Sequence, residues 1–232
     1  MTDDLQGFFR NRPPTVAEPL LGRTVLLVED SRFGCEAIRL ISLRSGARIR
    51  RADCIAAAER HLSTYSPTIA VIDLGLPDGD GLTLIRRLAA AQPRIPALIA
   101  TSGDDARRDE ALAAGADAFL PKPLVRIAAF QEAVLACLPR DLHPTGLRAV
   151  TAEVVLPDDL ALRDDLAHVA ELLQGPQSGV RTDYLSTFLK GVAKAADDDA
   201  LGRAAAGLRD GSTDVKTMLA LVQSRLKTPA EV

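Results

Sequence analysis

Four short apolar runs of this chain each end in side chains that could bind a cation or a phosphate group. In chain order these side chains are Glu29, Asp30, Asp73, Thr101 and Lys122. Because the carboxyl ends of parallel strands meet at one edge of a sheet, where such sheets bind their ligands, we expect the five to converge. Carboxylates suit a divalent cation, and a lysine and a hydroxyl suit phosphate oxygens. The pattern therefore predicts phosphoryl transfer to a carboxylate.

Asp73 is the predicted nucleophile, which would form an acyl phosphate. It ends an apolar run abruptly, and the turn Leu-Gly-Leu-Pro-Asp-Gly-Asp-Gly follows it. The carboxylates of Glu29, Asp30 and Asp73 are the predicted ligands of Mg²⁺ or Mn²⁺. The Lys122 ammonium and the Thr101 hydroxyl are the predicted partners of the phosphate oxygens.

Each of these residues also has a purely structural explanation when it is taken alone. The acidic pair Glu29-Asp30 is typical of a helix N-terminus, and a single lysine such as Lys122 is usually a solvated surface charge. A threonine such as Thr101 commonly caps a helix. Four strand ends with matching side chains in the right order favour one shared site over four coincidences.

The rest of this region supplies elements that would position the site. Apolar or strand-like runs are predicted at 24–28, 47–51, 68–72, 95–100 and 117–120. Helical periodicity is found at about 33–45, 54–63, 81–91, 104–114 and 124–138. Strands that alternate with helices of this length indicate parallel βαβ units. The predicted fold class is therefore α/β, with a doubly wound five-stranded parallel sheet.

Together these motifs resemble the phosphoacceptor site of the response-regulator receiver family, over about residues 23–140. The resemblance implies a flavodoxin-like fold and a phosphate donor that is a sensor histidine kinase or a histidine phosphotransfer protein. It implies self-catalysed phosphoryl uptake with slow hydrolysis, not an enzyme acting on a separate substrate. It also implies that the Gly75 carbonyl binds the metal, that the Lys122–Pro123 peptide is cis, and that Phe119 moves with Thr101 as a switch.

The chain divides into four predicted parts. Residues 1–22 form an irregular N-terminal arm, 23–140 the receiver domain, 141–156 a linker, and 157–232 an all-α bundle. In the last part, amphipathic helices are predicted at 158–174 and 182–196, then from Asp197 and from Ser212 or Thr213. Four such helices within about 75 residues fit a small helical bundle.

The composition argues against a nucleic-acid-binding, membrane or secreted protein. The 232 residues carry a net charge of −3, with a pI near 5.7, which gives no general attraction to nucleic acid or acidic lipid. The three cysteines lack the spacing of metal ligands and are expected to be small core side chains in a reducing compartment. No apolar run approaches the ~20 residues of a membrane span. Because the N-terminus also lacks a secretory pattern, we expect a soluble cytoplasmic protein that does not contact a membrane.

Three alternatives are considered for the signalling output of the helical region. DNA binding, as in a phosphorylation-controlled transcription regulator, is disfavoured because residues 157–232 hold nine Lys/Arg against twelve Asp/Glu. A histidine-phosphotransfer-like bundle, serving a phosphate sink or relay, is suggested by the stretch from Arg203 to Ser212, but no histidine stands near Ala206. His168 is the only histidine of this region, and its phosphorylation is left open. The third alternative is a plain interaction bundle, with homodimerisation left open. We expect the output to be protein contact.

Overall fold

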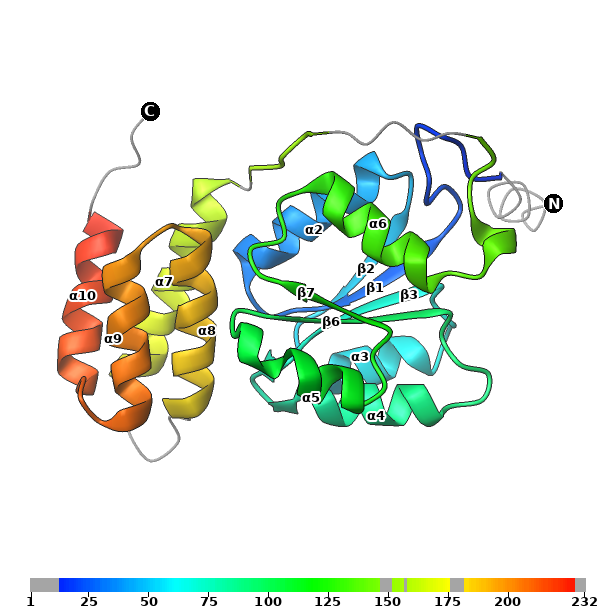
Figure 1. Cartoon of the computed structure of the whole chain (residues 1–232). Coiled ribbons are helices and arrows are strands. Elements are labelled where there is room, and N and C mark those ends of the chain that lie inside the picture. The colour runs from blue at the N-terminus through cyan, green and yellow to red at the C-terminus, as the bar shows by residue number, and fades with distance from the viewer. Residues whose placement is uncertain (1–12, 147–151, 157, 176–181, 228–232) are drawn as a thin grey trace.

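The structure is a computed structural model that describes residues 13–146, 152–156, 158–175 and 182–227. Residues 1–12 of the predicted arm and 147–151 of the predicted linker lie outside the described residues. So do residues 157, 176–181 and 228–232 of the predicted bundle. Within the described residues, an α/β domain and a helical bundle lie side by side (Figure 1).

Five parallel strands form the central sheet in the order β2-β1-β3-β6-β7. They are β1 (Thr24–Val28), β2 (Arg48–Ala52), β3 (Ile69–Asp73), β6 (Ala97–Ser102) and β7 (Ala118–Pro121). The central strands β1, β3 and β6 are almost entirely buried, as expected for strands covered on both faces. The basic strand β2 lies at the edge, where its exposed arginines reach solvent. The predicted five-stranded parallel sheet is confirmed.

Helices cover both faces of the sheet (Figure 1). One face carries α2 (Arg32–Arg44) and α6 (Ile127–Cys137), and the other carries α3 (Ile55–Leu62), α4 (Gly81–Ala90) and α5 (Arg108–Ala113). Successive side chains of a strand point to opposite faces. Val25 and Leu27 therefore pack with α2 and α6, whereas Leu26 and Val28 pack with the other three helices. The two resulting apolar layers fix the sheet between them.

The elements differ from the sequence prediction in three places. The helix expected over 104–114 opens as a 3₁₀ turn at Asp105–Arg107, which the Asp104 carboxylate caps, and α5 follows it. The helix expected from 124 begins only at Ile127, because Arg126 is held extended by a β-bridge to Val154. The turn after Asp73 contains a short antiparallel ribbon, β4 (Gly75–Leu76) and β5 (Gly79–Asp80).

Four helices form the second body, close to the predicted positions. They are α7 (Asp159–Gln174), α8 (Thr182–Ala195), α9 (Asp199–Asp210) and α10 (Val215–Lys227). Their apolar faces meet in a separate core that includes Val169, Leu189, Ala205 and Val222. Asp158 and Asp198 cap the N-termini of α7 and α9 by accepting hydrogen bonds from backbone N–H groups.

Two segments predicted to be irregular are anchored on the α/β domain. Leu20 is fully buried in its core, and the Leu20 N–H donates to the Ser45 carbonyl at 2.8 Å. Within 152–156, the Val155 side chain is buried in the same core, and its N–H donates to the Val125 carbonyl at 2.8 Å. The chain is therefore held against the α/β domain before it enters α7.

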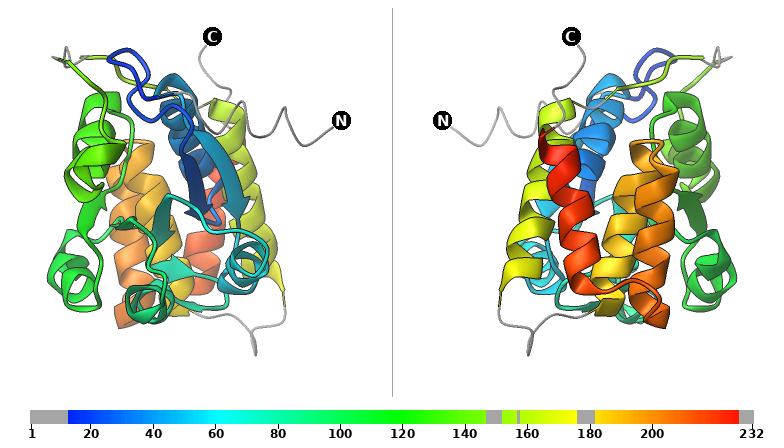
Figure 2. Two further views of the ribbon diagram at one scale, coloured as in Figure 1. Left: turned by 90° about the vertical axis from the view of Figure 1, so that its right-hand side faces the viewer. Right: turned by 90° about the vertical axis from the view of Figure 1, so that its left-hand side faces the viewer.

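The bundle stands against the edge of the α/β domain at which the sheet strands end (Figures 1 and 2). Helices α7 and α8 face this edge, and α9 and α10 lie on the far side of them. Among the described residues, no helix has the length and apolar character needed to span a membrane.

Candidate functional site

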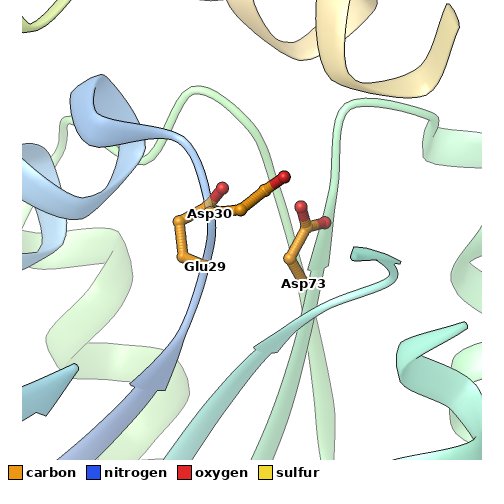
Figure 3. Close-up of side chains that lie close together, drawn as sticks. All are labelled: Glu29, Asp30 and Asp73. Atoms are coloured by element: carbon orange, nitrogen blue, oxygen red, sulfur yellow. The ribbon is translucent and has the colours of Figure 1, made fainter. Parts of the chain in front are cut away.

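Three carboxylates meet at the edge of the sheet that faces the bundle (Figure 3). Glu29 and Asp30 follow β1, and Asp73 is the last residue of the neighbouring strand β3. One oxygen of each lies within 4.8 Å of the others. Glu29 and Asp73 are buried, with 1% and 5% of their surface exposed. The sequence prediction that these residues converge is met by the geometry, whereas their roles stay predictions.

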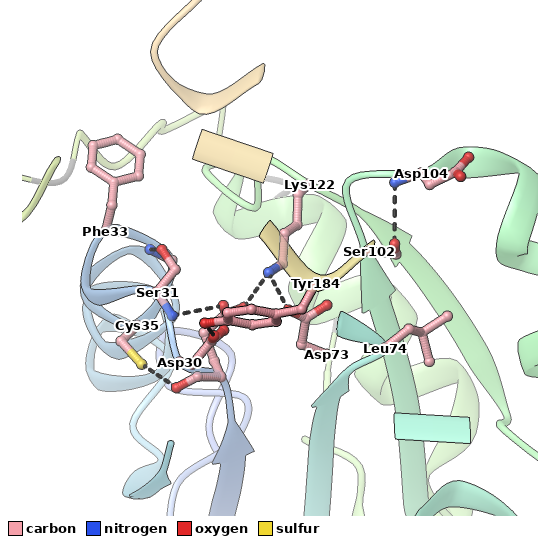
Figure 4. A network of polar contacts seen from close by, with 12 residues as sticks. Asp30, Ser31, Phe33, Cys35, Asp73, Leu74, Ser102, Asp104, Lys122 and Tyr184 are labelled. Carbon is pink, nitrogen blue, oxygen red and sulfur yellow. Dashed lines mark hydrogen bonds and ion pairs between the residues drawn. The ribbon is translucent and has the colours of Figure 1, made fainter. Parts of the chain in front are cut away.

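Lys122 brings one positive charge to this acidic cluster. Its Nζ lies 2.6 Å from Oε2 of Glu29 and 2.8 Å from Oδ2 of Asp73 (Figure 4). The Lys122 N–H donates to the Ser102 carbonyl, which ties the end of β7 to β6, and the Lys122–Pro123 peptide is cis, as expected. Burial by itself would lower the pKa of Lys122, but the carboxylates of Asp73 and Glu29 outweigh burial and raise it. The lysine is therefore a fixed ammonium.

The remaining negative charge is poorly compensated. Burial raises the pKa of Glu29 to about 8; Lys122 opposes this, and the nearby Asp73 and Asp30 carboxylates add to it. Burial, and then the charge of Asp73, raise the pKa of Asp30 to about 7. Among the described residues, Oδ1 of Asp30 is buried without a hydrogen-bond partner. Clustered carboxylate oxygens with this unmet demand for positive charge fit a hard divalent cation such as Mg²⁺ or Mn²⁺.

Thr101 reaches the site from the next strand, β6, where its backbone pairs in register with Asp73. Its side chain is fully buried, and within the described part of the chain its hydroxyl has no hydrogen-bond partner. A buried hydroxyl of this kind costs free energy unless something supplies a partner. An incoming phosphate oxygen would supply one.

The other two predicted site residues are Phe119 and Gly75. Phe119, on β7, is buried, and the Arg108 guanidinium lies 4.9 Å from the centre of its ring. Gly75 opens the ribbon after Asp73, and a Cβ placed on it would be 4.0 Å from Oδ2 of Asp73. The switch role of Phe119 and the metal-binding role of the Gly75 carbonyl remain predictions.

Two polar residues of the bundle also reach the site, and neither was predicted from the sequence to do so. The Tyr184 hydroxyl on α8 donates a 2.5 Å hydrogen bond to Oδ2 of Asp30 (Figure 4). Asp165 on α7 accepts hydrogen bonds from the Ser31 hydroxyl and from the N–H groups of Arg32 and Phe33. Asp165 lies between apolar positions of its helix, which indicates that it is buried. The local sequence does not indicate that its partners are at the start of α2.

His168 lies near these residues but is not part of the cluster. Its side chain is exposed on α7, and its ring packs edge-on against Phe188 at 6.5 Å between centres. With Asp30 and Tyr184 it lines an open groove between the two bodies.

Comparison with known proteins identifies the α/β domain. The family model described as "Response regulator receiver domain" matches residues 25–134. The transcriptional regulatory protein PhoP of Escherichia coli (strain K12) is 36% identical over 100 residues, which cover 43% of this chain and 45% of that protein. The virulence transcriptional regulatory protein PhoP of Salmonella typhimurium (strain LT2) gives the same identity and coverage. The chain thus spans less than half the length of these relatives.

Solved structures give matches over a similar share of the chain. The signal receiver domain of a signal transduction histidine kinase from Syntrophus aciditrophicus is 28% identical, with a TM-score of 0.45, and the match covers 50% of this chain and 89% of that one. A CheY-like receiver domain from Methylobacillus flagellatus is 26% identical, with a TM-score of 0.45, over 50% and 98% of the two chains. The match of the family model identifies residues 25–134 of this chain as a receiver domain of the response regulator family.

Proposed function

We propose that this chain is a two-component response regulator that accepts a phosphoryl group on Asp73 and signals through protein contacts of its helical bundle. The donor would be the phosphohistidine of a sensor histidine kinase or of a histidine phosphotransfer protein. The chain would act as a phosphoacceptor that catalyses its own loading and slow hydrolysis, not as an enzyme with a separate substrate. A cytoplasmic location is part of the same proposal.

The chemistry assigns one task to each polar group. A carboxylate oxygen of Asp73 attacks phosphorus, so that one O–P bond forms, the P–N bond to the donor imidazole breaks, and its electron pair returns to the imidazole. Glu29, Asp30 and Asp73 would hold Mg²⁺ or Mn²⁺, with the Gly75 carbonyl as a further ligand, and the cation would neutralise charge on the phosphoryl oxygens. Lys122 would bind a phosphoryl oxygen, since its ammonium already contacts Asp73.

The observation that carries this proposal is the unpartnered Thr101 hydroxyl beside a lysine and three carboxylates. A structural salt-bridge cluster would explain the lysine and the acids but not a fully buried hydroxyl without a partner in the described structure. A phosphoryl group on Asp73 would give this hydroxyl an acceptor. We propose that this bond draws Thr101 inward and that Phe119 follows by repacking, since its side chain has no hydroxyl.

The bundle supports output through protein contact more than through DNA. Residues 157–232 hold nine Lys/Arg against twelve Asp/Glu, and DNA affinity depends mainly on contacts to phosphate. PhoP is named a transcriptional regulatory protein, but its match covers only 100 residues of this chain, and the receiver-family match ends before the bundle. Homodimerisation of the bundle stays within the proposal.

Phosphoryl uptake is tested by incubating the full chain with Mg²⁺ and acetyl phosphate and measuring the labelled fraction by intact mass. Asp73→Asn should abolish a hydroxylamine- and base-labile adduct of one phosphoryl group while leaving the circular dichroism spectrum unchanged. Asp53→Asn is the matched control, because Asp53 is an exposed carboxylate that follows the edge strand β2. Metal-dependent labelling that persists in Asp73→Asn would overturn the assignment of the acceptor.

A further inference from the structure

One face of the bundle is built from residues that contact the receiver domain. On α8, Tyr184, Thr187, Gly191 and Lys194 recur at intervals of three or four residues, which places them on one side of the helix. On α7, Asp165 points to the same receiver edge. We call these five residues the docking face. The apolar side chains of α8, such as Leu185 and Leu189, are buried in the bundle core instead.

Asp165 provides the strongest anchor. Its carboxylate accepts hydrogen bonds from the N–H groups of Arg32 and Phe33, at 2.7 and 3.1 Å, in the first turn of α2. It also accepts one from the Ser31 hydroxyl at 2.7 Å. With 2% of its surface exposed, this carboxylate is a buried charge whose partners all come from the receiver. A helix N-terminus that offers free N–H groups stabilises such a charge.

The rest of the docking face lies directly over the acidic cluster. Tyr184 donates to Asp30, a predicted metal ligand, and thereby occupies one of its two oxygens. Lys194 pairs with Asp105 at 3.2 Å at the other end of α8. Between them the backbones approach closely, since a Cβ placed on Gly103 would lie 3.1 Å from Cα of Gly191. The absence of a side chain on Gly103 permits this approach.

Little room remains above the acceptor. The cavity between Asp73, Lys122 and α8 has a volume of about 30 Å³, which accommodates roughly two water molecules. The Asp73 side chain is only 7% exposed. A phosphoryl group together with a metal ion that keeps several waters needs more space than this. Because α8 covers Asp73 and the Tyr184 hydroxyl holds one oxygen of Asp30, loading of the site competes with the docked position of α8.

We propose that the docking face is an interaction surface for the unloaded receiver edge, and that metal and phosphoryl loading of this edge displace the bundle. This inference rests on the proposed function, because it concerns the loaded state of Asp73. A phosphate-donating protein must reach the same edge, so it competes with the bundle for it. Loading then frees the docking face, which becomes available to a protein partner only in the phosphorylated state.

The chain offers its own spectroscopic probe for this exchange. It has two tyrosines and no tryptophan, so a Tyr65→Phe background leaves Tyr184 as the only tyrosine. A phenol that donates to a carboxylate is quenched in fluorescence, and its release restores emission. We expect Tyr184 emission to rise when the Tyr65→Phe chain is loaded with Mg²⁺ and beryllofluoride. In Asp165→Asn on this background, emission should already be high before loading, because the anchor is weakened.

Metal binding gives an independent readout. Mn²⁺ binding to the full chain is measured by electron paramagnetic resonance, without any phosphate donor. Tyr184→Phe removes only the hydroxyl that competes for Asp30, so we expect Mn²⁺ to bind about tenfold more tightly, which is the lower range for a hydrogen bond to a charged group. Asp164→Asn is the control, because Asp164 forms an exposed pair with Arg32, and exposed pairs contribute little.

The outcomes separate this inference from the proposed function. If Mn²⁺ binds the wild type and Tyr184→Phe equally, and beryllofluoride leaves the Tyr184 emission unchanged, the docking inference is wrong while the proposed function stands. If the wild type, Tyr184→Phe and Asp165→Asn all fail to bind Mn²⁺, the proposed metal-assisted function is itself contradicted. The inference is supported if Tyr184 emission rises on loading and if Mn²⁺ binds more tightly to Tyr184→Phe but not to Asp164→Asn.

Discussion

The Nζ of Lys122 lies 2.8 Å from Oδ2 of Asp73, although Lys122 follows β7 and Asp73 ends β3, with β6 between these two strands. The lysine side chain therefore spans the end of β6 and neutralises part of the acidic cluster. The same ammonium contacts Glu29, so a single positive charge serves two buried carboxylates. This arrangement makes Lys122 both a structural counter-ion and the predicted phosphate ligand, and the two roles can be separated.

Lys122→Met should reduce phosphoryl uptake at least tenfold while it lowers stability only moderately. Removing the ammonium leaves the carboxylates without their counter-ion, but they can take up protons, which limits the cost to about 3 kcal/mol, the low end for a broken buried ion pair. Mg²⁺ should restore the melting temperature, because the cation replaces the lost charge, but it should not restore labelling. Thermal unfolding and intact-mass labelling are measured in parallel, with the exposed Lys216→Met as control. Equal loss of stability and labelling, both restored by Mg²⁺, would show that Lys122 is only structural.

Thr101→Val should leave the unloaded chain as stable as the wild type or stabilise it by about 1 kcal/mol. The hydroxyl is buried without a partner in the described structure, so its replacement by a methyl group removes a desolvation cost. On the Tyr65→Phe background, Thr101→Val should show a smaller rise in Tyr184 emission at a given beryllofluoride concentration, because the bound group loses one hydrogen-bond partner. Thr101→Ser, which keeps the hydroxyl, should retain the full rise. Denaturant unfolding and fluorescence check the two parts. A loss of several kcal/mol in Thr101→Val would mean that the hydroxyl has a partner in the unloaded state.

Much of the receiver domain could be predicted from sequence because its signals are local. Apolar strands alternate with amphipathic helices, and the side chain after each strand end falls at one edge of the sheet whatever the strand order. The convergence of Asp73, Thr101 and Lys122 therefore followed from three separate strand ends. The order of the strands and their register came only from the structure.

The contacts between the two bodies could not be predicted for a physical reason. Asp165 and Tyr184 find their partners more than 130 positions away, at the start of α2 and at Asp30. Helical periodicity indicates which face of a helix is buried, but it does not indicate which segment of the chain covers that face. The late start of α6 has a similar cause, because the bridge between Arg126 and Val154 joins segments that carry no strand pattern.

Asp198→Asn should destabilise the bundle at neutral pH and remove a pH dependence in acid. The Arg225 guanidinium, whose Nε lies 2.6 Å from Oδ2 of Asp198, lowers the pKa of this carboxyl below its ordinary value. A lowered folded-state pKa contributes stability above the unfolded-state value near 3.8, and the contribution is lost as pH falls through the folded-state pKa. Because Arg225 is 37% exposed, we expect only about 1 kcal/mol.

This expectation is checked by thermal unfolding of both chains between pH 3 and pH 7, with the difference between them as the measured quantity. Asparagine preserves the N-cap of α9, so the difference isolates the ion pair. The difference should be largest near neutral pH and should shrink below about pH 4. Asp199→Asn, at an exposed neighbouring position, should show a smaller difference. A difference that stays constant across this range would contradict the ion pair as the source.

Gly103→Ala should loosen the bundle without changing the receiver chemistry, whereas Gly191→Ala should leave docking intact. A Cβ on Gly103 would lie 3.1 Å from Cα and 3.2 Å from N of Gly191, and a backbone cannot yield as a flexible side chain does. A Cβ on Gly191 would meet only Cδ of Lys122, at an ordinary 3.9 Å. Both positions lack a positive φ, so alanine fits the backbone at each. On the Tyr65→Phe background, Tyr184 emission in the unloaded state should be raised in Gly103→Ala alone. If both variants keep the wild-type emission, the close approach of the two glycines does not hold the bundle on the receiver.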